Sequence, residues 1–211
     1  MRPARMPLVL VLVSACRAAS PGENAPIVQP GAPGQPSRVI TAEAAAALPS
    51  PAHTAADVRF MQGMIGHHAQ ALEMTGLLAT RTSSDDMRKL AKRIEVSQAD
   101  EIKMMQEWLA SRGEPLPDPH AHHADDAALM PGMLTREEMG RLAAARGPEF
   151  DRLFLRYMIK HHEGALVMVR ELFATPGAAQ EAEIFAFASE VEADQRMEIQ
   201  RMAAMLKELE G

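Results

Sequence analysis

Cysteine is almost missing from this chain of 211 residues, which contains only Cys16. A single cysteine can form neither an intramolecular disulfide nor a cysteine-based metal site. Tryptophan and tyrosine also occur once each, and alternating apolar and polar residues are not sustained anywhere, so the strand signal is weak. The apolar run at residues 8–13 is far too short to cross a bilayer. These absences exclude a disulfide scaffold and predict an all-α protein.

The N-terminus has the features of an export signal. Arg2 and Arg5 precede the apolar run, and residues 13–16, Val-Ser-Ala-Cys, resemble a bacterial lipobox. We therefore expect residues 1–15 to be a signal peptide and Cys16 to carry a lipid that holds the protein in the cell envelope, facing the periplasm or another extracytoplasmic space. Cleavage that leaves a free thiol and a cytosolic location are the alternatives.

Residues 16–52 are rich in proline, glycine, alanine and serine, with seven prolines between positions 21 and 51. Few large apolar residues are available there to build a core, so we expect a disordered tether behind the lipidated cysteine. Residues 53–211 then form one domain. The formal net charge of −6 argues against nucleic acid as a partner and leaves the lipid anchor as the expected link to the membrane.

Helix signals divide the domain into four long segments and one short segment. Capping residues and breakers place these helices at residues 54–79, 83 or 84 to 111, 135–147, 149–173 and 178–209. Thr54 with Asp57 and Thr135 with Glu138 have the spacing of capping boxes.

One helical phrase occurs twice, at residues 60–78 and 154–172, and nine of nineteen positions are identical. The identical pairs are Phe60/Phe154, Met64/Met158, Ile65/Ile159, His67/His161, His68/His162, Ala71/Ala165, Leu72/Leu166, Met74/Met168 and Leu78/Leu172. A second repeat relates residues 98–109 to residues 195–206. The repeats predict a four-helix bundle built from two repeated helical hairpins, with an additional short helix before the third long helix.

Paired histidines and methionines share the face of each repeated phrase that must turn to the core. Neutral imidazole and thioether are ligands that suit Cu(I) and the chemically similar Ag(I). The candidate metal ligands are Met64, His67, His68, Met74, Met158, His161, His162 and Met168. Methionine is also a common filler of irregular cores, so hydrogen-bonded core histidines without metal remain the alternative.

Three further groups are weaker candidates. Met105 and Met202, on the partner helices, could add thioether ligands, while Gln98 and Gln195 are expected to hydrogen-bond the histidines. A loop contains His120, His122 and His123, followed by Met130 and Met133. These loop residues could hold a metal or could simply be a solvated polar segment.

The paired phrases MIxHHxxALxM and the stretch SQxxEIxxMxxWL, residues 97–109, resemble the bacterial family called domain of unknown function 305. The resemblance covers about residues 54–209 and implies a ferritin-like fold and copper binding in the cell envelope. A ferritin-like di-iron oxidase needs Glu-x-x-His pairs, and no glutamate precedes any of the eight histidines by three positions. We therefore expect no enzyme.

The expected function is that of an exported protein that binds copper for sequestration, delivery or resistance, with envelope copper-handling proteins as candidate partners. The alternative is a lipid-anchored interaction module whose histidines are structural. The sequence leaves the oxidation state, the number of sites and the oligomeric state open.

Overall fold

The computed structural model describes residues 26–30, 35–49, 51–117 and 129–211. The chain divides into two compact units, Met1–Pro49 and Ser50–Gly211. The expected signal peptide and Cys16 lie outside the described residues.

The first unit contains short elements where a tether without secondary structure was expected. Strand β1 (Ile27–Gln29) pairs antiparallel with β2 (Arg38–Ile40), and Val28 lies opposite Val39. Helix α1 (Ala42–Ala46) follows, with Thr41 as its N-cap. Ile27, Val28, Val39 and Ile40 are β-branched or strand-favouring residues, which suits pairing between these two short segments. Neither strand nor helix has a buried residue, so the unit has no core of its own in the part described.

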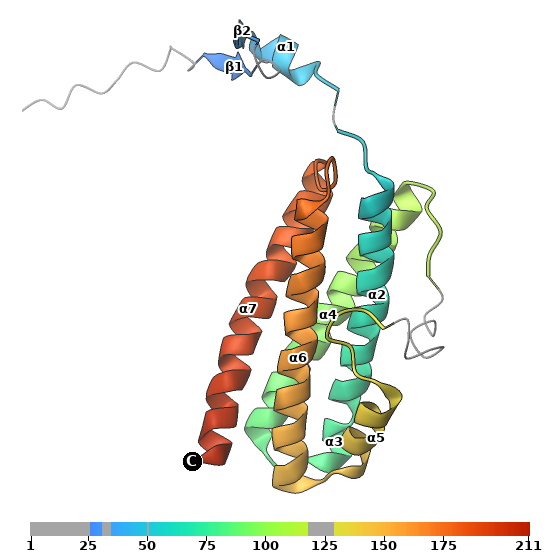
Figure 1. Ribbon diagram of the computed structural model, residues 1–211, viewed down its shortest axis with the longest axis vertical. Helices are drawn as coiled ribbons and strands as arrows, with labels where there is room; N and C mark the ends of the chain where they lie inside the picture. The colour runs from blue at the N-terminus through green and yellow to red at the C-terminus, as the bar shows by residue number, and fades with distance from the viewer. Residues whose placement is uncertain (1–25, 31–34, 50, 118–128) are drawn as a thin grey trace, which may run out of the picture. The chain divides into compact units, whose positions relative to one another are not determined.

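The second unit is an all-α bundle of four long helices (Figure 1). These are α2 (Ala55–Gly76), α4 (Asp85–Ser111), α6 (Gly147–Ala174) and α7 (Ala182–Glu210). Two short helices, α3 (Leu78–Arg81) and α5 (Arg136–Ala144), lie in the connections. Helix α2 packs on α4, α6 packs on α7, and the two hairpins meet through α2 and α6. The prediction of two repeated hairpins and an extra short helix is confirmed. None of the described helices is both long and apolar enough to cross a membrane.

The helix ends follow their capping signals. Thr54 and Asp57 form a capping box at the start of α2, and Thr135 and Glu138 form one at the start of α5. Helix α7 begins at Ala182, later than the expected residue 178. The delay has a local cause: Ala179 has a positive φ of 53°, and its N–H donates to the Asp57 carboxylate at 2.7 Å. This bond ties the turn before α7 to the first turn of α2.

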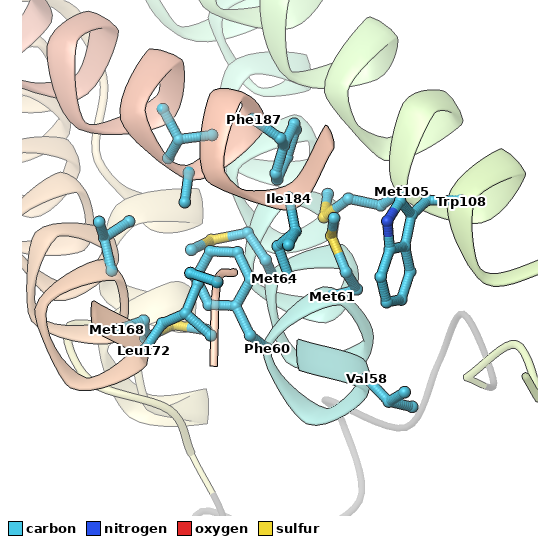
Figure 2. Packing of buried hydrophobic residues seen from close by; sticks show 14 of the residues in the cluster. Val58, Phe60, Met61, Met64, Met105, Trp108, Met168, Leu172, Ile184 and Phe187 are labelled. Carbon is cyan, nitrogen blue, oxygen red and sulfur yellow. The ribbon is translucent and has the colours of Figure 1, made fainter. Parts of the chain in front are cut away.

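Two separate hydrophobic clusters fill the bundle. The Met64 cluster draws on the first half of α2, the second halves of α4 and α6, and the first half of α7. Figure 2 shows Phe60, Met64, Met168, Ile184 and Phe187 packed together in this cluster. The Met158 cluster draws on the opposite half of each helix. The helix positions between the two clusters are therefore available for other side chains.

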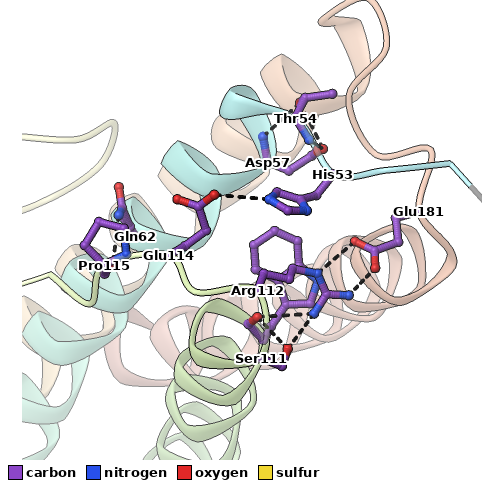
Figure 3. A network of polar contacts seen from close by, with 10 residues as sticks. His53, Thr54, Asp57, Gln62, Ser111, Arg112, Glu114, Pro115 and Glu181 are labelled. Atoms are coloured by element: carbon purple, nitrogen blue, oxygen red, sulfur yellow. Dashed lines mark hydrogen bonds and ion pairs between the residues drawn. The ribbon is translucent and has the colours of Figure 1, made fainter.

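A polar network closes the end of the bundle beside the Met64 cluster (Figure 3). Arg112 lies over the Trp108 ring, 4.3 Å from its centroid, and forms ion pairs with Glu181 and Glu183. His53 pairs with Glu114 at 3.1 Å. The network joins the end of α4 to the residues that begin α7.

Candidate metal centre

Eight buried polar side chains lie between the two hydrophobic clusters, and each is at most 9% exposed. We call them the polar layer: His67, His68, Gln98, Glu101, His161, His162, Gln195 and Glu198. Each of the four long helices contributes two of them. Helical spacing explains their direction, because each lies on the same face as the apolar residues one or two turns away. The predicted inward orientation of all four histidines is confirmed.

His67 and His161 meet across the contact between α2 and α6. Their ring centroids are 3.8 Å apart, with an interplanar angle of 36°. Burial away from water lowers the pKa of His67 to about 3, helped by the neighbouring His68 and His162, while the Pro131 carbonyl raises it. Burial, followed by the charges of the other three histidines, lowers the pKa of His161 well below its ordinary value. Both rings are therefore neutral at physiological pH and can offer a lone pair.

The other two histidines are each bonded to a buried glutamate. His68 Nε2 lies 2.5 Å from Glu101 Oε2, and His162 Nε2 lies 2.6 Å from Glu198 Oε2. An ionised carboxylate only accepts hydrogen bonds, so Nε2 carries the proton in both rings. The Nδ1 atoms are then the positions that can face a metal, in the carboxylate–histidine arrangement that orients metal ligands.

A backbone carbonyl holds His67 in the same way. Pro131 O lies 3.0 Å from His67 Nε2, so this nitrogen donates and Nδ1 remains without a partner. The segment that carries Pro131 packs directly on the backbone of α6 at Gly164. A Cβ added at Gly164 would lie only 1.9 Å from Pro131 O. A Cβ added at Gly132, which has a φ of +76°, would lie 2.7 Å from Gly164 Cα. Two glycines therefore bring this carbonyl to the histidine.

Most of the unpartnered polar atoms in the described core are concentrated in the polar layer. Nine buried side-chain nitrogen or oxygen atoms lack a hydrogen-bond partner, and seven belong to the layer: His67 Nδ1, His68 Nδ1, Gln98 Nε2, Gln98 Oε1, His161 Nε2, His162 Nδ1 and Gln195 Oε1. Buried polar atoms are rarely left unpaired, because each such atom costs about 1–3 kcal/mol. The layer therefore has the chemistry of a site that a ligand completes.

The candidate methionines flank the polar layer in two groups that mix the repeated phrases. Met64, Met105 and Met168 belong to the first cluster. Met74, Met158 and Met202 belong to the second. Met64 and Met74, which share one helix, therefore lie in different clusters, and each is grouped with a methionine of the other phrase.

One expectation about the site needs correction, and one contact of the site was not expected. Gln98 and Gln195 were expected to bond the histidines, but Glu101 and Glu198 do so for His68 and His162. Both glutamates belong to the second repeated stretch and fall on the apolar stripe of their helices, so a helical wheel could have found them. No sequence signal pointed to the Pro131 carbonyl.

Within residues 26–30, 35–49, 51–117 and 129–211, no three His, Cys, Asp or Glu side chains are grouped so as to hold a metal ion. A metal held in the polar layer would therefore need methionine sulfur among its ligands. His120, His122 and His123 lie outside the described residues.

The sequence profile of the family described as Domain of unknown function (DUF305) matches residues 57–206. The chain belongs to the DUF305 family. No curated protein matches it.

Two solved DUF305 structures have the same fold. A presumed secreted DUF305 protein from Streptomyces coelicolor is 30% identical, with a TM-score of 0.65 over 74% of this chain and 94% of that one. A DUF305 fragment from Deinococcus radiodurans is 33% identical, with a TM-score of 0.64 over 75% and 99%.

The protein CopM is also similar. Its Cu(II)-bound form is 25% identical, with a TM-score of 0.60 over 72% of this chain and 96% of CopM. Its Cu(I)-bound form is 26% identical, with a TM-score of 0.58 over 74% and 98%. CopM has in addition been crystallised with silver. Metal binding is thus found in proteins with the DUF305 fold.

Proposed function

We propose that this DUF305 protein binds a soft metal ion, Cu(I) or Ag(I), in the polar layer. The observation that carries the proposal is that each of the four buried histidines has one ring nitrogen without a partner. Two of the rings have a strongly lowered pKa, so they need lose no proton when a metal binds. Thioethers from Met64, Met158 and the methionines grouped with them flank these rings, which favours a soft cation.

The metal is a cargo, and binding is reversible coordination without bond-making chemistry. The copper- and silver-bound forms of CopM support this choice of metal. We further propose that the protein works in the cell envelope, attached through a lipid on Cys16, and that it sequesters copper or delivers it to envelope copper-handling proteins. The similarity to a presumed secreted protein supports export.

A competition titration tests the site. The protein is titrated with Cu(I) against a chelator, together with a variant in which His67, His68, His161 and His162 are replaced by glutamine. We expect the variant to lose at least about tenfold in affinity, because each replacement removes an imidazole ligand. The matched control replaces His120, His122 and His123 by glutamine and should bind as the wild type does. Circular dichroism checks that both variants are folded.

The alternative function, an interaction module with structural histidines, predicts a different result. Equal affinity in all three proteins, with no effect of Cu(I) on thermal stability, would favour it. Loss of binding only in the His120, His122 and His123 variant would place the site in that segment.

A further inference from the structure

A pocket of about 260 Å³ opens where α2, the end of α6 and the segment before α5 meet. Its lining includes Phe60, Gly63, Met130, Pro131, Met168 and Leu172. Two of these side chains carry a thioether, and no histidine lines the pocket. The pocket is therefore separate from the polar layer and has a donor set of its own.

Gly63 makes room for the two methionines. A Cβ at this position would lie 2.9 Å from Met130 Sδ and 3.5 Å from Met168 Cε. The ends of both side chains thus lie close together over Gly63, where α2 has no side chain. Met168 is 8% exposed and Met130 is half-buried, whereas Met64, Met74 and Met158 are fully buried. Met130 and Met168 are therefore the thioethers of the described core that solvent can reach through this pocket.

The corresponding positions of the other repeated phrase carry different residues. Tyr157 occupies the repeat position that corresponds to Gly63, and the counterpart of Met168 is the fully buried Met74. A tyrosine side chain is far larger than the hydrogen of Gly63. The two repeated phrases therefore differ at the positions that form the pocket.

The pocket shares Pro131 and the Met64 cluster with the surroundings of His67. Met130 precedes Pro131, whose carbonyl accepts the hydrogen bond from His67 Nε2. Met168 belongs to the same cluster as Met64, one turn of α2 from His67. A cation held between Met130 and Met168 would thus lie next to Pro131, whose carbonyl contacts His67, and in the same cluster as Met64.

We propose that Met130 and Met168 form a port for a soft monovalent cation, Cu(I) or Ag(I), through which the metal reaches the polar layer. Thioether sulfur is uncharged and prefers such cations to Mg²⁺, Ca²⁺ or Zn²⁺. The two exposed charged residues that line the pocket, Arg59 and Glu171, have opposite signs and give no net attraction for hard cations. Two sulfurs bind more weakly than the larger donor set of the layer, so the metal can move inward. The destination of the metal rests on the proposed function, but the port itself does not.

The first test measures the rate of uptake. Full-length protein is mixed with the Cu(I)–bicinchoninate complex, and the loss of its colour is followed by stopped flow over a range of protein concentrations. A variant with Met130→Leu and Met168→Leu should take up Cu(I) about tenfold more slowly, and Met130→Leu alone, which leaves every candidate ligand of the polar layer in place, should slow uptake at an unchanged final affinity. Met197→Leu, at a methionine that is 60% exposed, is the matched control and should match the wild type. Unchanged rates in the double variant would overturn the port, and so would a loss of affinity equal to that caused by removing the histidines.

The second test does not depend on the polar layer. Full-length protein labelled with ¹³C at the methionine methyl groups is titrated with Ag(I) in the variant that has glutamine at the four histidines of the layer. Selective shifts of the Met130 and Met168 signals, with Met197 unaffected, are expected if the port binds metal without the layer. Unaffected Met130 and Met168 signals contradict the port, whatever the fate of the proposed function. If the wild type and the variant without the four histidines bind the metal with equal affinity, the proposed function is contradicted but the port is not.

Discussion

Glu101 and Glu198 determine which ring nitrogen of His68 and His162 can face a metal. Each carboxylate accepts from Nε2, at 2.5 Å and 2.6 Å, and each is held on the helix opposite its histidine. Glu101 also accepts a hydrogen bond from Ser97 at 3.3 Å. A carboxylate behind an imidazole fixes the ring's orientation and raises its basicity as a ligand. These two glutamates would therefore act on a bound metal through the histidines.

Replacing Glu101 by glutamine should lower the affinity for Cu(I) by about tenfold while the protein stays folded. The amide can turn its NH₂ group toward His68, which would move the ring proton to Nδ1 and block the nitrogen that faces the metal. Competition titration measures the effect. Glu107→Gln, an exposed glutamate on the same helix, is the control and should leave the affinity unchanged. An affinity equal to that of the wild type would mean that Glu101 does not orient a ligand.

Two glycines control the packing of the segment before α5 against α6. Gly132 and Gly164 approach so closely that a Cβ on Gly132 would lie 2.7 Å from the Gly164 Cα. Gln70 holds the same segment from α2, because it donates to the Leu134 carbonyl at 2.9 Å and accepts from the Leu134 N–H at 2.7 Å. The segment therefore delivers the Pro131 carbonyl to His67 as a rigid part of the bundle.

Gly164→Ala tests this packing. The new Cβ would lie 1.9 Å from Pro131 O, so the segment must move and the bond to His67 must lengthen or break. We expect a loss of about 1–3 kcal/mol in the free energy of unfolding. Gly140→Ala, inside α5 with nothing within 4 Å of its added Cβ, should be neutral or stabilising by about 1 kcal/mol. Denaturant titration of both variants gives the comparison, and equal stabilities would contradict the role of Gly164.

The sequence predicted which side chains point into the core better than their positions along the bundle axis. Periodicity places the histidines and methionines on the inward face of each helix, and capping residues locate most helix ends. Which methionines contact one another depends on the axial register of the antiparallel helices. That register cannot be read from a single sequence. The grouping of Met64 with Met168, and the docking of Met130 over Gly63, therefore required the structure.

The polar layer divides the core of the whole bundle and makes its stability dependent on pH. The buried rings of His67 and His161 stay neutral in the folded protein, at a pKa of about 3 for His67 and well below the ordinary value for His161. In the unfolded chain both rings titrate near a pKa of about 6.5. As the pH falls below that value, these two histidines bind protons in the unfolded chain but not in the folded bundle. Acid therefore favours unfolding through these two groups.

Between about pH 6.5 and pH 4, the free energy of unfolding should fall by up to about 1.4 kcal/mol per pH unit for each of the two histidines. Other groups also titrate in this range, so the difference between variants isolates the effect. His161→Leu should flatten the dependence, because one ring no longer contributes, whereas Met197→Leu, at an exposed position that carries no titrating group, should not. Denaturant unfolding at pH 6.5, 5.5 and 4.5 measures all three proteins. A slope that His161→Leu leaves intact would mean that the folded bundle accepts the proton, and the layer would then hold charged rather than neutral imidazoles.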